Sequence, residues 1–504
     1  MPIVNSIISW LTTKRLKQIN WYKLYPQDIQ NEVLSQLVKD AQDTEWGQKY
    51  GYAAINTIED FQKSVPLNDY DALKPYIERV QRGEQNILWH TPIKWFAKSS
   101  GTTNDKSKFI PVSTESLEQN HIRCGRDTIL LYTRNNPETN LYKGKSLGLG
   151  GSHYASSVNI DTYFGDVSAI LMQHLPFWAQ IYRTPAISVA LMDEWEEKLQ
   201  KMAEITATEN VVSIAGVPSW MLVLLRHMME INKVDSVLDI WQNLELFIHG
   251  GVNFSPYREQ FKAIIPSENM RYMEVYNASE GFFGIQDDPE TDDMLLMIDV
   301  GVFYEFIPME HFYDQNPKAL TLHDVELGVN YALVISTNAG LWRYIIGDTV
   351  MFTSHNPYKI KITGRVKHFI NAFVEELMVD NAEMALAEAC KRTHAKISEY
   401  TAAPIFMTND SQGGHEWLIE FDEEPQNIQH FAELLDNQLK ALNSDYEAKR
   451  YKDMTLKFPT IQIVPKGTFY NWLKMKGKLG GQHKIPRLSN ERQYVEEIVK
   501  LIRS

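Results

Sequence analysis

Residues 244–251 read Leu-Glu-Leu-Phe-Ile-His-Gly-Gly, an apolar run of strand length that ends in a glycine turn. Ser255-Pro256 follows as a predicted helix start, and a second apolar run extends from Arg271 to Val275. Strand, glycine turn, helix and strand in this order are typical of an α/β sheet. Because ligands bind such sheets at the carboxyl ends of strands, the turn at Gly250-Gly251 and residues 276–281 are predicted to face a ligand.

The size and charge of the chain limit the classes it can belong to. Its 504 residues exceed what one hydrophobic core usually supports, so at least two domains are expected. A formal net charge of −14 argues against nucleic acid as a partner, since binding a phosphate backbone needs a basic surface. The two cysteines, Cys124 and Cys390, argue against a disulfide framework and indicate a reducing, cytoplasmic location.

No membrane segment is expected. No apolar run reaches the ~18 residues that a span requires. Residues 1–20 lack the pattern of a secretory signal and instead carry apolar residues at helical spacing, which predicts an amphipathic helix packed on the protein body.

The regions before and after residues 244–251 differ in predicted structure. The first ninety residues are predicted to be mostly helical, with breaks at Pro66 and Pro75. Residues 158–229 are predicted to form mixed buried helices. Further strands are predicted at 294–298, 301–307 and 330–337, and Asp348 is expected at a turn after the apolar run 341–347.

A smaller module is predicted after Gly364-Arg365-Val366-Lys367. Asp380 is expected to cap an alanine-rich helix, followed by a strand at 416–421, a helix at 428–442 and strands within 455–464. The fold is therefore expected to be α/β, with a large N-terminal domain of mixed sheets and helices, residues 1–365, and a small mobile α+β domain, residues 366–504.

A polar loop at residues 98–108 reads Lys-Ser-Ser-Gly-Thr-Thr-Asn-Asp-Lys-Ser-Lys. Its hydroxyls and backbone N–H groups suit a polyphosphate, its glycine permits close approach, and its lysines neutralise charge. The loop lacks the G-x-x-x-x-G-K-[ST] spacing of a P-loop, so a P-loop NTPase is disfavoured. Taken alone, the same composition also suits a polar surface loop.

Four segments, in this order, resemble motifs of the adenylate-forming superfamily of acyl-CoA synthetases and luciferases. Residues 99–108 resemble its phosphate loop, and Tyr276-Asn277-Ala278-Ser279-Glu280 resembles its Tyr-x-x-Ser-Glu motif. Residues 343–348 resemble the third motif, which ends in Gly-Asp, and Lys484-Ile485-Pro486-Arg487 resembles the C-terminal lysine segment. The chain is most similar to the acyl-acid amido synthetase branch, the auxin-responsive promoter family, and resembles a bacterial-type member of it.

The resemblance implies a two-step reaction. A small carboxylic acid is activated by ATP as an acyl-adenylate, with release of pyrophosphate, and the acyl group is then transferred to an amine, such as an amino acid, to form an amide. ATP and Mg²⁺ are the implied cofactors. Residues 1–365 are implied to bind the nucleotide and the acid, and residues 366–504 to form a lid hinged near Arg365.

The resemblance also implies roles for individual residues. Lys484 is the implied catalytic residue, whose ammonium stabilises the charge that develops in the adenylation transition state. Glu280 is the implied Mg²⁺ ligand, and Asp348 the acceptor for the ribose hydroxyls. The implied nucleotide site consists of Ser99, Ser100, Gly101, Thr102, Thr103, Lys108, Gly250, Gly251, Tyr276, Asn277, Ala278, Ser279, Glu280, Tyr344, Asp348 and Arg365.

Two alternative functions share part of this reasoning. An acyl-CoA ligase uses the same adenylation step with coenzyme A as the acceptor. A nucleotide-binding protein without catalysis would need the phosphate loop but not Lys484. The sequence leaves open the acid, the amine, the general base and the oligomeric state.

Overall fold

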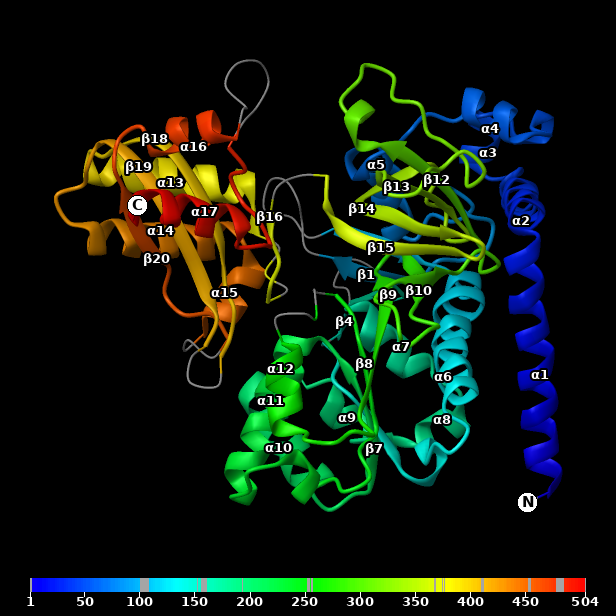
Figure 1. Cartoon of the computed structure of the whole chain (residues 1–504). Coiled ribbons are helices and arrows are strands. Elements are labelled where there is room, and N and C mark those ends of the chain that lie inside the picture. Colours follow the sequence, from blue (N-terminus) through cyan, green and yellow to red (C-terminus); the bar gives the residue numbers. More distant parts are fainter. Residues whose placement is uncertain are drawn as a thin grey trace.

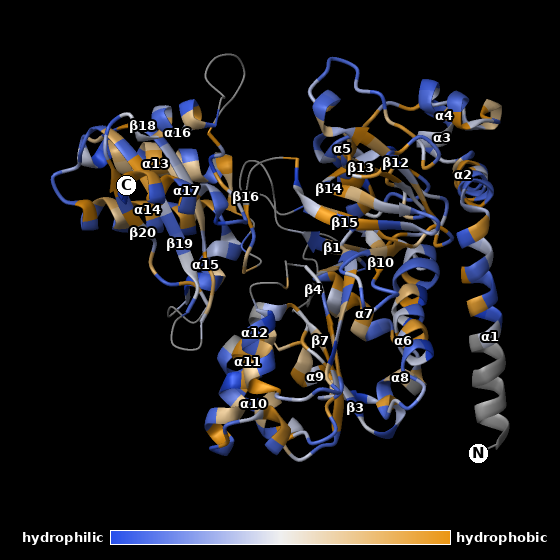
Figure 2. Cartoon of the chain, viewed as in Figure 1, coloured by the Kyte–Doolittle hydropathy of each residue, from blue (hydrophilic) through white to orange (hydrophobic). Residues whose placement is uncertain are grey.

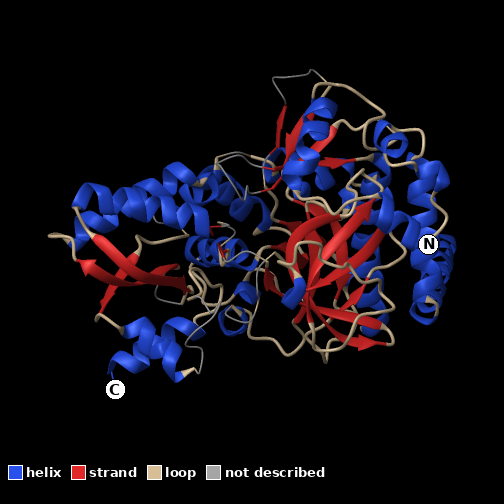
Figure 3. Cartoon of the chain, turned by 90° about the horizontal axis from the view of Figure 1, so that it is seen from above, coloured by secondary structure: helices blue, strands red, loops and turns tan. Residues whose placement is uncertain are grey.

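A computed structural model gives the architecture of the chain (Figure 1). It describes residues 2–99, 108–151, 153–155, 161–192, 194–251, 254, 257–366, 369–373, 375, 377–408, 412–451, 455–476 and 485–503. These residues form a large part built on one extended sheet and a smaller C-terminal part with its own sheet, which lies beside it when seen from above (Figure 3). The predicted α/β fold with a large N-terminal and a small C-terminal part is confirmed.

The N-terminal region is helical, as predicted. Its helices are α1 (Pro2–Leu24), α2 (Pro26–Ala41), α3 (Glu45–Lys49), α4 (Ile58–Ser64) and α5 (Tyr70–Gln81), with a short 3₁₀ turn, η1, at Tyr52–Ala54. Pro66 lies between α4 and α5, but the predicted break at Pro75 is wrong, because this residue lies inside α5. The helix continues past the missing N–H since Leu73, Ile77 and Val80 on one face are buried in the core.

An eleven-stranded sheet forms the centre of the large part, in the order β12-β13-β14-β15-β11-β10-β9-β8-β7-β3-β6. Its first half, which includes β10, is antiparallel, whereas β9, β8, β7, β3 and β6 run parallel. In sheet order the bounds are Val302–Pro308, Asn330–Thr337, Tyr344–His355, Tyr358–Arg365, Met294–Leu296, Gly281–Ile285, Arg271–Ala278, Leu246–His249, Val211–Gly216, Lys145–Gly148 and Arg183–Thr184. The parallel half places the carboxyl ends of several strands along one edge.

Helices cover both faces of the parallel half (Figure 1). One face packs on α6 (Arg123–Asn135) and α7 (Val167–His174), and the other on α10 (Trp195–Thr206), α11 (Pro218–Asn232) and α12 (Arg258–Ile264). Between α7 and α10 in the chain lie two short helices, α8 (Phe177–Ile181) and α9 (Ile187–Ala190), and α9 packs against α7. The π-helical turn η2 (Ser116–Ile122) runs directly into α6. Short 3₁₀ turns are η3 (Leu141–Lys143), η4 (Val237–Asp239) and η5 (Met309–His311).

The prediction of buried helices for residues 158–229 is partly wrong. Strands β6 and β7 also form there, because the apolar residues Val211 to Ile214 are buried between the two helical layers. The predicted cap at Ser255-Pro256 lies outside the described residues, and α12 itself begins at Arg258.

A second, four-stranded sheet has the order β2-β1-β5-β4, with bounds Lys108–Val112, Trp95–Ser99, Tyr163–Gly165 and His153–Ala155. Strands β1 and β2 are antiparallel, and Ser99 pairs with Lys108 at their ends. This pairing brings together the two ends of the predicted phosphate loop. Residues 100–107 of that loop lie outside the described residues.

The C-terminal part is built on the sheet β18-β19-β20, with bounds Lys396–Ile405, Gly414–Glu423 and Thr460–Val464, and the hairpin of β16 (Phe369–Ile370) and β17 (Leu377–Met378) precedes it. Its helices are α13 (Val379–Thr393), α14 (Ile428–Leu442), α15 (Ser444–Arg450), α16 (Thr468–Met475) and α17 (Gln493–Arg503). Apolar residues gather in the strands and on the helix faces turned toward them (Figure 2).

The predicted cap of α13 is wrong. The helix begins after Met378, whose N–H donates to the Asn381 side chain at 3.1 Å, so Asp380 lies within its first turn. None of the described helices has the length and apolar character needed to cross a bilayer.

Candidate active site

One large cavity, of about 3160 Å³, opens at the carboxyl ends of the parallel strands and extends between the two parts of the chain. It brings together most of the described residues that the sequence assigned to a nucleotide site. These are Ser99, Gly250, Gly251, Tyr276, Asn277, Ala278, Ser279, Glu280, Asp348 and Arg365. Ser100, Gly101, Thr102, Thr103 and Lys484 lie outside the described residues.

Asp348 joins two of these residues in one polar cluster. Its Oδ2 accepts a hydrogen bond from the phenol of Tyr276 at 2.5 Å, and Nε of Arg365 lies 2.7 Å from Oδ1. Burial raises the pKa of Tyr276 well above its usual value, and the Asp348 carboxylate raises it further. The phenol therefore stays protonated and remains a donor.

The expected turn at Asp348 is wrong, because the residue lies inside β14, directly opposite Arg365 of β15. The preceding Gly347 has a positive φ of 96°, which allows the strand to bend without ending. Tyr276, Asn277 and Ala278 likewise belong to β9, since they pair with β10, and the hairpin turn is confined to Ser279 and Glu280.

Glu280 is the buried carboxyl group of this turn, with 9% of its surface exposed. Burial raises its pKa to about 7, and the Asp348 carboxylate adds to the shift. The cations of Lys108 and Arg365 oppose it but do not offset the burial. A carboxyl group in this condition is ready to ionise when further positive charge arrives, which is typical of a ligand site.

Lys108 and Tyr344 are the two predicted residues within the described part of the chain that do not line the cavity. The Lys108 ammonium lies 5.8 Å from the centre of the Tyr70 ring, and the residue is 9% exposed, so it is not a solvated surface lysine. Tyr344 is 0% exposed, packs in the core of the large part and is not among the residues that line the cavity.

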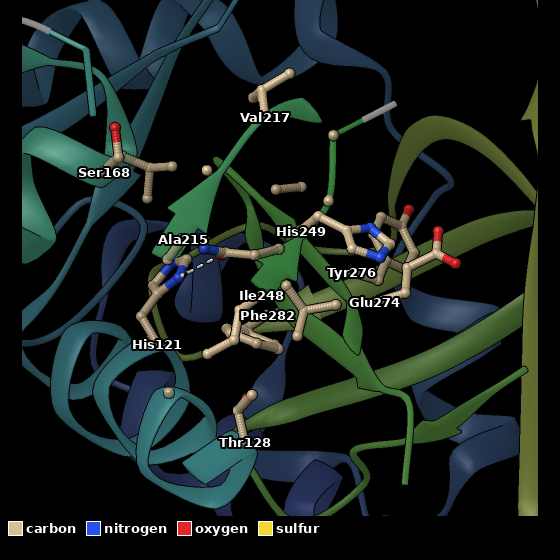
Figure 4. A pocket seen from close by; sticks show the side chains of 18 of the residues that line it. His121, Thr128, Ser168, Ala215, Val217, Ile248, His249, Glu274, Tyr276 and Phe282 are labelled. Atoms are coloured by element: carbon tan, nitrogen blue, oxygen red, sulfur yellow. Dashed lines mark hydrogen bonds between the residues drawn. The ribbon is translucent and has the colours of Figure 1, made fainter. Parts of the chain in front are cut away.

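Asn120 and His121 of η2, which the sequence did not single out, hold the β9–β10 hairpin. The Asn120 side chain donates to the carbonyl of Phe282 at 3.0 Å and accepts from its N–H at 2.6 Å. Nδ1 of His121 lies 3.1 Å from Oδ1 of Asn277, the bond dashed in Figure 4. Burial lowers the pKa of His121 to about 4, so the ring is neutral and Nδ1 is the donor.

His249 and Glu274 lie on neighbouring strands β8 and β9, in register with each other, and both line the cavity (Figure 4). The His249 ring stacks on Phe254 with 4.0 Å between ring centres, and burial lowers its pKa to about 3. Burial raises the pKa of Glu274 to about 7. The glycine turn that follows His249 is the signal in the sequence that could have drawn attention to this pair.

Gly250 has to be a glycine, because a Cβ atom there would lie 2.4 Å from the carbonyl oxygen of Val275. Gly251 adopts a positive φ of 84°. Because neither glycine carries a side chain, the backbone at the end of β8 packs closely on its neighbours, and the space beside it is left for a ligand.

The opposite face of the same strands contributes a mainly apolar compartment. Small side chains, Ala215 and Ser213 on β7 and Ser146 on β3, leave space there, and the two serine hydroxyls bond each other at 2.9 Å. Figure 4 shows the other labelled walls of this compartment, contributed by Thr128, Ser168, Val217, Ile248 and Phe282. A pocket with apolar walls and a few polar groups suits the body of an organic acid.

Solved structures that resemble this chain define its class as the adenylate-forming fold. A GH3.15 acyl acid amido synthetase superposes with a TM-score of 0.61 at 17% identity, covering 96% of this chain and 95% of that one. A 2-hydroxyisobutyryl-CoA ligase, solved with 2-HIB-AMP and CoA, superposes with a TM-score of 0.57 at 12% identity, covering 95% and 92%.

The sequence identifies the family within that class. Residues 15–270 match the GH3 family N-terminal domain, residues 295–365 the central domain and residues 380–493 the C-terminal domain. The chain belongs to the GH3 family. The indole-3-acetic acid-amido synthetase GH3.3 of Arabidopsis thaliana is 24% identical over 94% of this chain and 92% of its own length. A jasmonoyl-L-amino acid synthetase, GH3.5 of Oryza sativa subsp. japonica, is 24% identical over 94% of both.

Proposed function

We propose that this protein is an ATP-dependent acyl-acid amido synthetase. It activates a carboxylic acid as an acyl-adenylate, releases pyrophosphate, and transfers the acyl group to an amine, an amino acid, to form an amide. The observation that carries the proposal is the convergence of Ser99, Glu280 and the Tyr276–Asp348–Arg365 cluster on one cavity, in a chain that matches the GH3 family along its length.

The nucleotide is proposed to lie over the carboxyl ends of β8 and β9. Each oxygen of Asp348 keeps a lone pair beyond its bond to Tyr276 or Arg365, so the carboxylate is able to accept both ribose hydroxyls. Tyr276 and the backbone at Gly250-Gly251 are proposed to bound the adenine. Donors of the 99–108 loop, namely Ser99, Ser100, Thr102 and Thr103, are assigned to the phosphates, with Lys108 adding positive charge.

Mg²⁺ is proposed to bind through Glu280. Its buried carboxyl group, with a pKa raised to about 7, has the oxygen chemistry of a Mg²⁺ ligand and an incomplete set of counter-charges. Among the described residues no group of three or more His, Cys, Asp or Glu is arranged to hold a metal ion, which suits an ion that takes its other ligands from phosphate oxygens and water. Bound there, the ion would neutralise phosphate charge.

Lys484 is proposed to stabilise the adenylation transition state, in which two anionic groups meet. Residues 366–504 are proposed to form a domain that moves between the two steps about a hinge at Arg365. In the described structure the N–H of Val366 donates to the carbonyl of Gly347 at 2.8 Å, which ties the start of this segment to the strand that carries Asp348.

ATP–pyrophosphate exchange across a panel of aryl, indolyl and aliphatic acids tests the first step. At least one acid is expected to support exchange, and Lys484→Ala is expected to lower its rate roughly 10²–10³-fold while ATP binding persists. Absence of exchange with every acid would contradict the proposal and favour a nucleotide-binding protein without catalysis. Near-normal exchange in the variant would remove Lys484 from the mechanism.

The acceptor separates the two enzyme classes that share the adenylation step. AMP release is expected to accelerate when amino acids are added to the acid and ATP, with formation of an amide that mass spectrometry detects. Acceleration by coenzyme A and not by amino acids would identify an acyl-CoA ligase instead.

A further inference from the structure

Lys449 of α15 brings a buried cation from the C-terminal part to the wall of the cavity. The residue is 9% exposed and lines the cavity. Its Nζ lies 3.9 Å from the centre of the ring of Trp220, at the start of α11 in the large part. The ammonium therefore sits at the junction of the two parts, in contact with an indole face.

Lys449 makes no ion pair with any described residue. Asp445, Glu375 and Asp166 act on it at longer range, and burial outweighs them and lowers the pKa of Lys449 to about 8. Glu375 is already engaged, since it pairs with Nε2 of His415 at 2.8 Å and accepts from the N–H of Phe373 at 2.6 Å. A buried ammonium without a counter-ion is costly, and contact with an indole offsets a small part of that cost.

The next residue, Arg450, shows how this chain treats a buried cation that supports the fold. Its Nε and Nη2 donate to the two oxygens of Asp436 at 2.7 and 3.1 Å, and Nη1 donates to the carbonyl of Leu456 at 2.8 Å. Arg450 is thus fully partnered, whereas Lys449 on the same helix is not. The difference indicates that Lys449 is kept for a ligand.

Lys449 lines the same cavity as the proposed nucleotide site. Trp220 follows β7, whose neighbour β8 ends at His249, directly before Gly250. Asp166, one of the charges that Lys449 senses, follows β5, and β5 lies parallel to β1, which leads into the 99–108 loop. Ser99, Asp166, Trp220, Gly250 and Lys449 all line one continuous cavity.

We propose that Lys449 binds the carboxylate of the acceptor amino acid. This inference rests on the proposed amido synthetase function and names the chemistry by which that site would recognise its second substrate. One buried ammonium matches one monoanionic carboxylate. Coenzyme A carries several phosphate charges, which call for more than a single buried cation. Trp220, whose ring the ammonium of Lys449 contacts, offers apolar surface to an amino-acid side chain.

The transfer step balances with this arrangement. The ammonium of the amino acid first loses a proton to water. Its nitrogen then forms a C–N bond to the acyl carbon, the C–O bond to the AMP phosphate breaks, and AMP leaves with the electron pair. The second amine proton passes to water. Lys449 takes no part in the proton transfers and holds the carboxylate so that the amine points at the acyl carbon.

Matched pairs of acceptors test the proposal, namely amino acids and their primary amides, which keep the amine and lose the negative charge. The wild-type protein is expected to prefer the acid, and Lys449→Met is expected to raise the KM of the amino acid roughly 10–100-fold, the effect of losing one charge-assisted hydrogen bond. The same variant should treat acid and amide alike, and Lys449→Arg should keep part of the preference. Lys457→Met, at an exposed lysine of the same part, is the control.

Pyrophosphate exchange, which needs no acceptor, separates this proposal from the proposed function. Lys449→Met is expected to leave exchange at the wild-type rate. Equal use of acid and amide by the wild type, a preference that survives in Lys449→Met, or loss of exchange in that variant would each overturn the proposal. If no acid supports exchange in the wild type, the proposed function fails. In that case, titration calorimetry of the same amino acids and primary amides with the wild type and with Lys449→Met decides whether the carboxylate site exists.

Discussion

Two buried charged groups of the large part differ in how completely they are compensated. Arg343 forms two bonds of 2.9 Å with Glu305 and donates to the carbonyls of Gln62 and Val65 at 2.9 and 2.7 Å. Glu280, in the turn between β9 and β10, keeps a raised pKa because its neighbouring cations do not offset its burial. The first arrangement is complete without a ligand, whereas the second is completed by one.

The largest expected effect comes from breaking the complete pair. Arg343→Met leaves Glu305 buried without its partner, and the free energy of unfolding is expected to fall by about 3–5 kcal/mol. Denaturant unfolding measures the change. The double variant Arg343→Met/Glu305→Leu removes both charges and is expected to recover much of the loss. A single variant as stable as the wild type would show that the pair does not support the fold.

The same experiment at Glu280 is expected to give the opposite pattern. Glu280→Gln removes the proposed Mg²⁺ ligand, so pyrophosphate exchange is expected to fall roughly 10²-fold, as on loss of a preorganised electrostatic contact. Its unfolding free energy at pH 8 is expected to stay equal or rise, because a costly buried charge is gone. If Glu280→Gln lowered the unfolding free energy as much as Arg343→Met, Glu280 would have to be regarded as a structural group like Arg343 and not as a ligand site.

Local patterns in the sequence account for the elements that the structure confirms. The helix predicted at 428–442 coincides with α14, because its apolar residues recur at helical spacing and face the small sheet. The strands predicted around 244–248 and 330–337 appear as β8 and β13, each an apolar run bounded by turns. The order of the motifs was sufficient to predict the adenylate-forming fold and the family.

What local patterns missed depends on contacts between distant segments. Asp348 was placed at a turn because a glycine precedes it, yet pairing with β15 keeps it in a strand. Lys449 carries no local signal of burial, since its environment arises from Trp220, far away in the sequence. Asn120 and His121 lie on a helical turn whose partner, the β9–β10 hairpin, is equally distant.

A smaller effect is expected from trimming the cluster that touches Asp348. Tyr276→Phe removes one of the two contacts that orient Asp348 but leaves its pair with Arg365, so the carboxylate stays ionised and is held less firmly. The loss of a hydrogen bond to a charged acceptor, about 1.5–3 kcal/mol, is expected to appear in ATP affinity. Titration calorimetry with ATP measures it. Unchanged affinity would mean that the phenol serves packing and does not order the nucleotide site.

The smallest effect is expected at His121, a buried neutral group, in contrast to the buried charged groups Arg343 and Glu280. Because its folded pKa of about 4 lies below the value near 6.5 of an unfolded histidine, the unfolded chain binds more protons between these pH values. Stability from this residue is complete above pH 6.5 and is lost as the pH falls toward 4. From pH 7.5 to 5.5 the wild type is expected to lose about 1 kcal/mol more unfolding free energy than His121→Gln.

Denaturant unfolding at the two pH values measures this difference directly. The cost of repacking glutamine at position 121 is the same at both, so it cancels when each variant is compared with itself. His249, whose pKa burial also lowers, is present in both proteins and cancels in the same way. Identical pH dependence in the two proteins would mean that His121 takes up its proton as readily in the folded protein as in the unfolded chain, and the neutral wall of the apolar compartment would have to be assigned to other residues.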